Sequence, residues 1–287
     1  MIVIDMSNLV FSQVLDFHLK TKEQVDMPVV RNLCIDKMKS HKAKLGKEFG
    51  PEIVLAFDSK HYWRKDIFPY YKGKRKKGRD ESTFDWKSFF PMYDQFKQEL
   101  RDYFPVKCLE VEGAEADDLM GVLGPRYAPH TPVCLVTSDG DMIQLQHQNS
   151  NIKQWSPWHK KFLTPKNAEY DLFEHICQGD AGDGVPNILS DDDTFMADPK
   201  KRQKPLRKDR LAEWKKHGIT NPEYFCPDSA ALDRFHRNRK LIDLRCIPAD
   251  LTTKIVESYE AAVPATGKMF GYLTTMKLTK ILKEGGF

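Results

Sequence analysis

The sequence lacks the usual marks of a secreted, membrane or zinc-binding protein. Its six cysteines are scattered, with neither a CxxC pair nor a zinc-ligand spacing. No apolar run reaches the roughly 18 residues of a membrane span, and the chain does not open with a basic region followed by a long apolar stretch. These absences predict reduced thiols, no membrane partner and a cytoplasmic location.

The remaining composition is that of a globular protein with strongly uneven charge. The 287 residues, 40% of them hydrophobic, suffice for one large domain or two smaller ones. A net charge of +4 conceals two basic stretches, residues 60–79 and 200–210, in which Asp66 and Asp209 are the only acids. Concentrated positive charge is typical of a protein that binds a phosphate polymer. A solvated surface or a flexible loop is the alternative for each stretch.

Four separated segments carry acidic residues at the end of an apolar run: IVID, IVLAFD, CLEVEGAEADD and VCLVTSDGD. Short runs rich in Val, Ile and Leu are typical of buried parallel strands. Because open α/β sheets place ligands at the carboxyl ends of their strands, the acids are expected to converge. They are Asp5, Asp58, Glu115, Asp117, Asp118, Asp139 and Asp141.

Such a convergence needs a compensating cation. Two like charges about 4 Å apart repel by roughly 4 kcal/mol at an effective dielectric near 20. Carboxylates without His or Cys are the ligands that Mg²⁺ prefers, so the pattern predicts a magnesium site. The alternative is that each acid only caps a helix or a turn.

The order of elements predicts an α/β fold with a central, mostly parallel sheet flanked by helices. Strands are expected at 2–5, 52–57, 106–111 and 133–137, with helices at 27–45, 86–103 and 166–177 and a first helix capped by Ser7 or Asn8. A mobile basic and aromatic segment is expected to follow Asp58. Helices from about residue 228 would form a smaller C-terminal region. The turn QGDAGDGVPN, with Asp180 and Asp183, either approaches a ligand or is an ordinary loop between domains.

The motifs VIDMSN, AFDSK, YYKGKR, EGAEADD, TSDGD and GDAGDGVPN follow one another along most of the chain. In this order they resemble the flap endonuclease family of 5′ nucleases, and within it the ribonucleases H of T-even bacteriophages. The resemblance implies a PIN-like nuclease domain over residues 1–185, with a flexible basic arch at about 60–100. It also implies a helical DNA-binding region over residues 186–287.

Transferred to this sequence, the family pattern implies two Mg²⁺ ions, for which Mn²⁺ can substitute. Asp5, Asp58, Glu115, Asp117 and Asp118 would surround the first ion, and Asp139, Asp141, Asp180 and Asp183 the second. Asp5, Asp58, Glu115 and Asp117 are assigned to catalysis, with Lys72 and Arg75 neutralising the scissile phosphate. The predicted nucleic-acid contacts are Tyr71, which would stack on an unpaired base, and Lys72, Lys74, Arg75, Lys76, Lys77, Gly182 and Gly184.

The implied activity is 5′ to 3′ exonuclease and flap endonuclease cleavage of DNA and RNA–DNA hybrids, removing RNA primers from lagging-strand fragments in the cytoplasm of a phage host. Branched or nicked nucleic acid with a 5′ end would be the substrate. A monomer is expected, with a single-strand-binding protein or a sliding clamp as candidate partners. The chain departs from many relatives after GVPN, where a second glycine-rich turn is replaced by a basic insertion, so Lys200 to Arg210 are the alternative phosphate contacts. The competing interpretations are a non-catalytic, metal-assisted DNA-binding protein and a single-strand ribonuclease of the PIN type.

Overall fold

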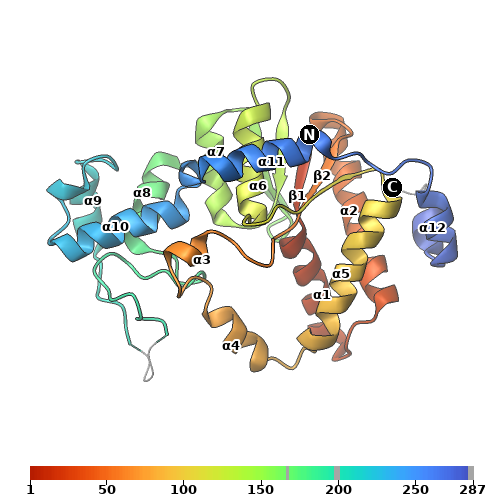
Figure 1. The fold of residues 1–287 in the computed structure, drawn as a ribbon, viewed down its shortest axis with the longest axis horizontal. Coiled ribbons are helices and arrows are strands. Elements are labelled where there is room, and N and C mark those ends of the chain that lie inside the picture. The colour runs from red at the N-terminus through yellow and green to blue at the C-terminus, as the bar shows by residue number, and fades with distance from the viewer. Residues whose placement is uncertain (166–167, 197–200, 284–287) are drawn as a thin grey trace.

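The computed structural model describes residues 1–165, 168–196 and 201–283, and a six-stranded sheet lies at its centre (Figure 1). Neighbouring strands are parallel, except that the edge strand β6 runs antiparallel to β5. In spatial order the strands are β3 (Lys107–Leu109), β2 (Ile53–Ala56), β1 (Ile2–Asp5), β4 (Val133–Val136), β5 (Ile152–Ser156) and β6 (Lys161–Leu163). The expected mostly parallel α/β sheet is confirmed.

The four strands predicted from apolar runs are present, whereas β5 and β6 were missed. Strand β5 has the sequence IKQWS, in which the polar Gln154 and Ser156 are both buried. Strand β6 is only three residues long and partly exposed. Neither segment contains an apolar run. In β5, buried polar side chains interrupt the apolar ones, and β6 is short and partly exposed.

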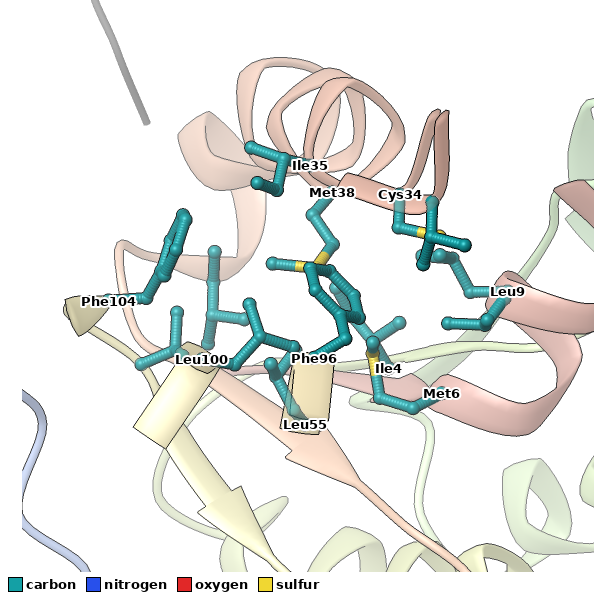
Figure 2. Packing of buried hydrophobic residues seen from close by; sticks show 14 of the residues in the cluster. Ile4, Met6, Leu9, Cys34, Ile35, Met38, Leu55, Phe96, Leu100 and Phe104 are labelled. Atoms are coloured by element: carbon teal, nitrogen blue, oxygen red, sulfur yellow. The ribbon is translucent and has the colours of Figure 1, made fainter. Parts of the chain in front are cut away.

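One face of the sheet is covered by α1 (Met6–Thr21), α2 (Met27–Phe49) and α5 (Trp86–Tyr103). Figure 2 shows Met38 and Cys34 of α2 and Phe96 of α5 packed over Ile4 and Leu55 of the central strands. The helices predicted at 27–45 and 86–103 are therefore confirmed. Because their apolar sides meet the same face of the sheet, they hold β1 and β2 rigidly at the centre of the molecule.

The opposite face is covered by α6 (Ala116–Tyr127), α7 (Ile143–Gln148) and α11 (Ala249–Ala261), with the short 3₁₀ helix η3 (Leu244–Cys246) beside α6. Side chains of successive residues on β1 alternate between the two faces: Ile2 and Ile4 pack with α2, and Val3 packs with α6. The result is a three-layer arrangement with a buried sheet. Another 3₁₀ turn, η1 (Gly140–Met142), joins β4 to α7.

A third apolar cluster lies beside the sheet and joins segments far apart in sequence. It contains Phe68 and Tyr71 from the basic segment, Ile176 from α8 (Ala168–Gln178) and Phe235 from α10 (Ser229–Ile242). Helix α9 (Lys208–Lys215) and the 3₁₀ helix η2 (Pro222–Tyr224) flank it. The start of the helix predicted at 166–177, including Lys166, lies outside the described residues, as does Lys200 of the second basic stretch.

The basic segment after Asp58 is more ordered than the sequence suggested. It forms α3 (Arg64–Ile67) and α4 (Lys74–Asp80), and its residues Phe68, Tyr71 and Phe84 are buried. The prediction of a wholly mobile segment is therefore wrong for its two ends, which are anchored by aromatic side chains. Only α4, which has no buried residue, stands away from the core (Figure 1). We call residues 60–85 the arch.

The helices after residue 185 do not gather in one place. Helix α10 packs with α8, and α11 packs with α6. At the opposite end of the molecule, α12 (Met269–Thr275) and α13 (Thr279–Lys283) add Tyr272 and Ile281 to the cluster under α2 (Figure 1). The domain boundary at 185/186 remains a prediction. Among the described residues, no helix is long and apolar enough to cross a membrane.

Candidate metal centre and active site

The sheet brings the predicted carboxylates to one edge. Asp5 ends β1, Asp58 follows β2 and Asp139 follows β4, and these strands are adjacent and parallel. Glu115 and Asp117 lie at the start of α6, and the backbone N–H of Ala116 donates a hydrogen bond of 2.8 Å to Asp58. The carboxyl edge of the sheet therefore carries acids from four separate segments.

Backbone and hydroxyl groups fix the orientation of the central acids. The N–H of Asn8 donates to Asp5 at 2.9 Å, and the hydroxyl of Thr137 donates to the other oxygen of Asp5 at 3.0 Å. The hydroxyl of Ser7 donates to Asp58. Asp5 is thus the N-cap of α1, and the prediction that Ser7 or Asn8 would cap this helix is wrong. One oxygen of Asp5 caps helix α1, and the Asp5 carboxylate remains one of the acids at the acidic edge.

The carboxylates repel one another strongly. Burial, together with the negative charge of Asp58, raises the pKa of Asp5 to about 7. Burial and the charge of Asp139 hold the pKa of Asp117 well above its usual value. Desolvation and the charge of Asp141 raise the pKa of Asp139 to about 6. Several oxygen donors that resist ionisation together fit a hard divalent cation, which would supply the missing positive charge.

Glu115 is held by cations of the arch. Its side chain is 1% exposed and accepts from the guanidinium of Arg64 at 3.0 Å. The hydroxyl oxygen of Tyr71 lies 3.2 Å from the same carboxylate, and the ammonium of Lys72 contacts its other oxygen. Because these donors come from the arch, Glu115 connects the arch to the acidic edge. Sequence reasoning missed Arg64, which was indistinguishable from its neighbours within a basic run.

Asp118, predicted as a ligand of the first metal, has a structural role at the start of α6. It is fully buried, pairs with Arg64 at 2.8 Å and accepts from the backbone N–H of Glu115 at 2.9 Å. This reciprocal capping box closes the first turn of α6. Its carboxylate turns back toward Arg64 and Trp63, and its role as a metal ligand stays a prediction.

The GDAGDG turn places a second group of acids beside the first. Asp180 accepts from the backbone N–H groups of Gly182 and Asp183 at 2.7 and 3.0 Å. The turn needs glycine at position 179, where φ is +68° and a Cβ atom would lie 2.4 Å from the carbonyl oxygen of Pro186. The negative charge of Asp183 also contributes to the raised pKa of Asp139, so the charges of the two groups interact.

His175 lies between two of these acids and was missed by sequence reasoning. Its Nδ1 is 3.1 Å from Asp141 and its Nε2 is 3.5 Å from Asp180. Burial would lower the pKa of His175, but its hydrogen bonds to Asp141 and Asp180 raise it to about 10. Burial would likewise raise the pKa of Asp180, which His175 and the turn N–H groups instead lower to about 2. Together the three side chains could hold a metal ion. A lone histidine on a helix gives no signal in one sequence.

Asp183 is tied to the arch by both side chain and backbone. The hydroxyl of Tyr71 and the guanidinium of Arg75 donate to its carboxylate at 2.8 and 2.7 Å. The backbone N–H of Lys72 donates to the carbonyl of Asp183 at 2.7 Å. Residues 71–75 of the arch and the GDAGDG turn therefore form one connected unit.

Two of the predicted nucleic-acid contacts are wrong. Tyr71 is 4% exposed, and its ring belongs to the apolar cluster under α10, so it has no free face for a base. Gly184 is buried, and a Cβ atom there would lie 3.1 Å from the carbonyl oxygen of Tyr70. Gly182 is exposed at the tip of the turn.

The predicted basic contacts divide by exposure. Lys72 has a side chain only 7% exposed, whereas that of Arg75 is 51% exposed. Lys76 and Lys77 are exposed on α4, and the Lys74 ammonium lies 3.7 Å from the centre of the Phe195 ring. A cleft of about 1110 Å³ separates the arch from α1 and α5. The residues that line it include Asp58, Glu115, Lys72, Arg75, Lys76 and Arg79, with the aromatic side chains Phe11, Trp86 and Phe90.

Comparisons with known proteins agree with this architecture. Residues 1–172 match the model of the 5′-3′ exonuclease N-terminal resolvase-like domain, and residues 166–284 match that of the T4 RNase H C-terminal domain. Ribonuclease H of Enterobacteria phage T4 is 32% identical over 286 residues, covering 97% of this chain and 92% of that protein. The 5′-3′ exonuclease of Buchnera aphidicola is 31% identical over 147 residues, with 48% of each chain covered.

Solved structures show the same fold. The 5′-exonuclease of T5 with bound divalent metal ions (zinc) has a TM-score of 0.66 at 15% identity, covering 91% of this chain and 98% of that one. The bacteriophage T5 flap endonuclease in a complex with DNA and metal ions has a TM-score of 0.60 at 17% identity, covering 90% and 98%. With an acidic edge, a basic arch and both family models matched in order, this chain belongs to the 5′-3′ exonuclease family of nucleases, alongside the ribonuclease H of phage T4.

Proposed function

We propose that this nuclease depends on Mg²⁺ and hydrolyses phosphodiester bonds near the 5′ ends of DNA and RNA–DNA hybrids, as a 5′ to 3′ exonuclease and flap endonuclease. Its role would be the removal of RNA primers from lagging-strand fragments during phage replication. The observation that carries the proposal is the edge of mutually repelling carboxylates, three of them with raised pKa, at one side of a basic cleft. Acids repel nucleic acid unless cations lie between them.

Eight carboxylates are the proposed ligands of two divalent ions. Asp5, Asp58, Glu115 and Asp117 would hold the first ion, and Asp139, Asp141, Asp180 and Asp183 the second. His175 lies within reach of Asp141 and Asp180 and is a further donor for the second ion. When bound, two such ions supply an activated water and stabilise the oxygen that leaves.

The remaining residues of the site would orient the substrate. Arg75 has an exposed guanidinium at the mouth of the cleft, where it can contact a phosphate through two hydrogen bonds. Lys72 is paired with Glu115, so we assign it to balancing the charge of the acidic edge as well as that of the scissile phosphate. Lys76 and Lys77 would attract the single-stranded 5′ end into the cleft.

The relatives support this assignment at the level of their names. One is a ribonuclease H, and the T5 structures were obtained with divalent metal ions and with DNA. The helices after residue 185, together with the basic residues of 201–210, are the proposed duplex-binding region. A single-strand-binding protein or a sliding clamp remains a proposed partner, and the protein is proposed to act as a monomer.

Cleavage of a 5′-labelled flap duplex in Mg²⁺ and in EDTA tests the proposal. The wild-type protein should release short 5′ products in Mg²⁺ and none in EDTA. Asp117→Asn, which removes a charge from the acidic edge, should reduce turnover by at least 100-fold while the flap still binds. Asp250→Asn, at a side chain 74% exposed on α11, is the matched control and should cleave normally. Binding without cleavage by the wild type would favour the non-catalytic alternative.

A further inference from the structure

The turn between β5 and β6 leaves the sheet at the same edge as the catalytic acids. Strand β5 is parallel to β4, so its carboxyl end lies next to the loop that carries Asp139. In the order of strands, β5 and β6 lie on one side of β1, whereas β2, which leads into the arch, lies on the other. The turn and the arch therefore flank the acidic edge from opposite sides.

The tip of this turn presents an exposed indole. Trp158 is 79% exposed, the largest value for an aromatic side chain in the described part of the chain. Burial of a side chain of this size would stabilise the fold by a few kcal/mol, and the exposed Trp158 does not supply this stabilisation. Its position is explained better by binding than by packing.

Hydrogen bonds hold the turn firmly beside the acidic edge. The backbone N–H of Trp158 donates to the hydroxyl of Ser138 at 3.1 Å, and the Ser138 and Ser156 hydroxyls are 2.9 Å apart. The N–H of His159 donates to Ser156 at 3.2 Å. Since Ser138 directly precedes Asp139, the backbone of Trp158 is anchored one residue away from a proposed metal ligand.

The turn is also basic. His159, Lys160 and Lys161 are exposed, and no ion pair with an acid joins them among the residues that the structure describes. Lys160 adopts a left-handed conformation with φ of 53°, an uncommon choice for a residue other than glycine. An exposed aromatic plane next to unpaired cations is the combination with which proteins bind unpaired bases and their phosphates.

We propose that residues 157–161 form a second nucleic-acid contact, in which Trp158 stacks on a base exposed where the duplex opens and Lys160 and Lys161 contact the adjoining phosphates. This inference rests on the proposed function, because the nucleic acid is the substrate of the neighbouring site. A strand that enters beneath the arch and crosses the acidic edge meets this turn on the far side. The contact is independent of sequence, since every base offers a flat face.

Binding is measured by fluorescence anisotropy of labelled 5′-flap and blunt duplexes, with Ca²⁺ in place of Mg²⁺. Trp158→Ala should weaken binding of the flap about tenfold and binding of the blunt duplex much less, because stacking needs an unpaired or exposed base. Trp158→Phe should restore part of the affinity. Phe270→Ala, at a side chain 72% exposed on the distant helix α12, is the matched control and should bind like the wild type.

Charge and fold are checked separately. Replacing Lys160 and Lys161 with Ala should reduce the salt dependence of binding to both duplexes, and thermal unfolding of every variant should match the wild type, because these side chains are exposed. If the wild-type protein cleaves the flap and Trp158→Ala binds the flap equally well, the inference is overturned and the proposed function remains intact. If the wild-type protein binds no nucleic acid, both the inference and the proposed function are overturned. If Trp158→Ala loses affinity only for a protein partner and not for nucleic acid, the turn is a protein-docking site and the inference is overturned.

Discussion

Arg64 balances two buried carboxylates at the point where the arch leaves the sheet. Its side chain, 3% exposed, pairs with Glu115 and Asp118 and donates to the carbonyl of Leu241 at 2.8 Å. A buried pair adds little net stability, but removing one partner leaves the other charge without compensation. Arg64 therefore matters chiefly as the buried cation that pairs with both Glu115 and Asp118.

Arg64→Met should lower the free energy of unfolding by about 3 to 5 kcal/mol. Urea unfolding at neutral pH measures the loss. Lys20→Met is the control, since the ammonium of Lys20 is 72% exposed in a surface pair with Asp16 and should contribute less than about 1 kcal/mol. Equal stability of the two variants would contradict a stabilising role for the pairs of Arg64 with Glu115 and Asp118.

His41 gives the fold a dependence on acid. It is 3% exposed on α2, and burial, with the charges of Lys37 and Lys44, lowers its pKa from 6.5 to about 4. Below pH 6.5 the unfolded chain binds a proton that the folded chain excludes. Stability is therefore lost as the pH falls from about 6.5 to 4, by roughly 3 kcal/mol for this residue alone.

The His41→Leu variant should lack the loss of stability that protonation of His41 causes in acid. Urea unfolding of both proteins at pH 7, 5.5 and 4.5 gives the difference in stability at each pH, in which contributions of other groups cancel. As the pH falls, the free energy of unfolding of His41→Leu should rise relative to that of the wild type. A constant difference would show that His41 is protonated or hydrated in the folded state.

At the level of single residues, the sequence located the acids of the edge but not the side chains that complete it. Asp5, Asp58 and Asp139 were predictable because each ends an apolar run. His175 and Arg64 were not, because their partners Asp141, Asp180, Glu115 and Asp118 become neighbours only through folding. The capping role of Asp118 was not predictable either, because an acid in a capping box has the same spacing as a metal ligand.

Helix α4 is the element most directly suited to attract a single strand. It carries Lys76 and Lys77 on its exposed surface and has no buried residue. Each phosphate contact on a single strand contributes about 0.7 to the slope of log affinity against log salt concentration. The charge of the helix, rather than its packing, therefore determines its contribution.

Replacing both Lys76 and Lys77 with Ala should reduce the magnitude of this slope by roughly 1.4 for a 5′-flap substrate. Affinities measured between 50 and about 200 mM salt supply the slope. A double variant of Lys20 and Lys254, which are exposed on α1 and α11, removes the same charge elsewhere and should leave the slope unchanged. A weaker affinity with an unchanged slope would contradict phosphate contact by α4.

The elements themselves were predictable where apolar pattern dictates them. Strands β1, β2 and β4 are buried on both faces, so their sequences are uninterrupted apolar runs. Strand β5 was missed because Gln154, whose amide donates to the carbonyls of Thr137 and Asp139, takes the place of an apolar residue. A buried polar side chain is stable there only because these carbonyls accept its hydrogen bonds.

The molecule as a whole is held together by its C-terminal helices. Tyr272 and Ile281 belong to the cluster under α2, Leu251 and Ile255 to the cluster under α6, and Phe235 to the cluster beside the arch. Each core of the nuclease is therefore completed by residues after 185. This distribution could not be predicted from the composition of the C-terminal segment, which is polar and helical.

A truncated chain of residues 1–185 should lose the cooperative unfolding of the full chain, because all three cores would expose apolar surface to water. Circular dichroism during thermal unfolding, with binding of an apolar dye, measures this. The full chain is the control. A truncated chain that unfolds cooperatively and binds no dye would establish residues 1–185 as an independent domain.

The backbone bond from Lys72 to Asp183 has a consequence for cooperativity between ligands. If a nucleic-acid strand and a cation bind as proposed, a strand that orders the arch would also fix Asp183, and a cation held by Asp183 would also fix the arch at Lys72. By thermodynamic linkage, each ligand must then raise the affinity for the other by the same factor. The concentration of metal that half-saturates the proposed site would then be lower when a flap occupies the arch than in the free protein.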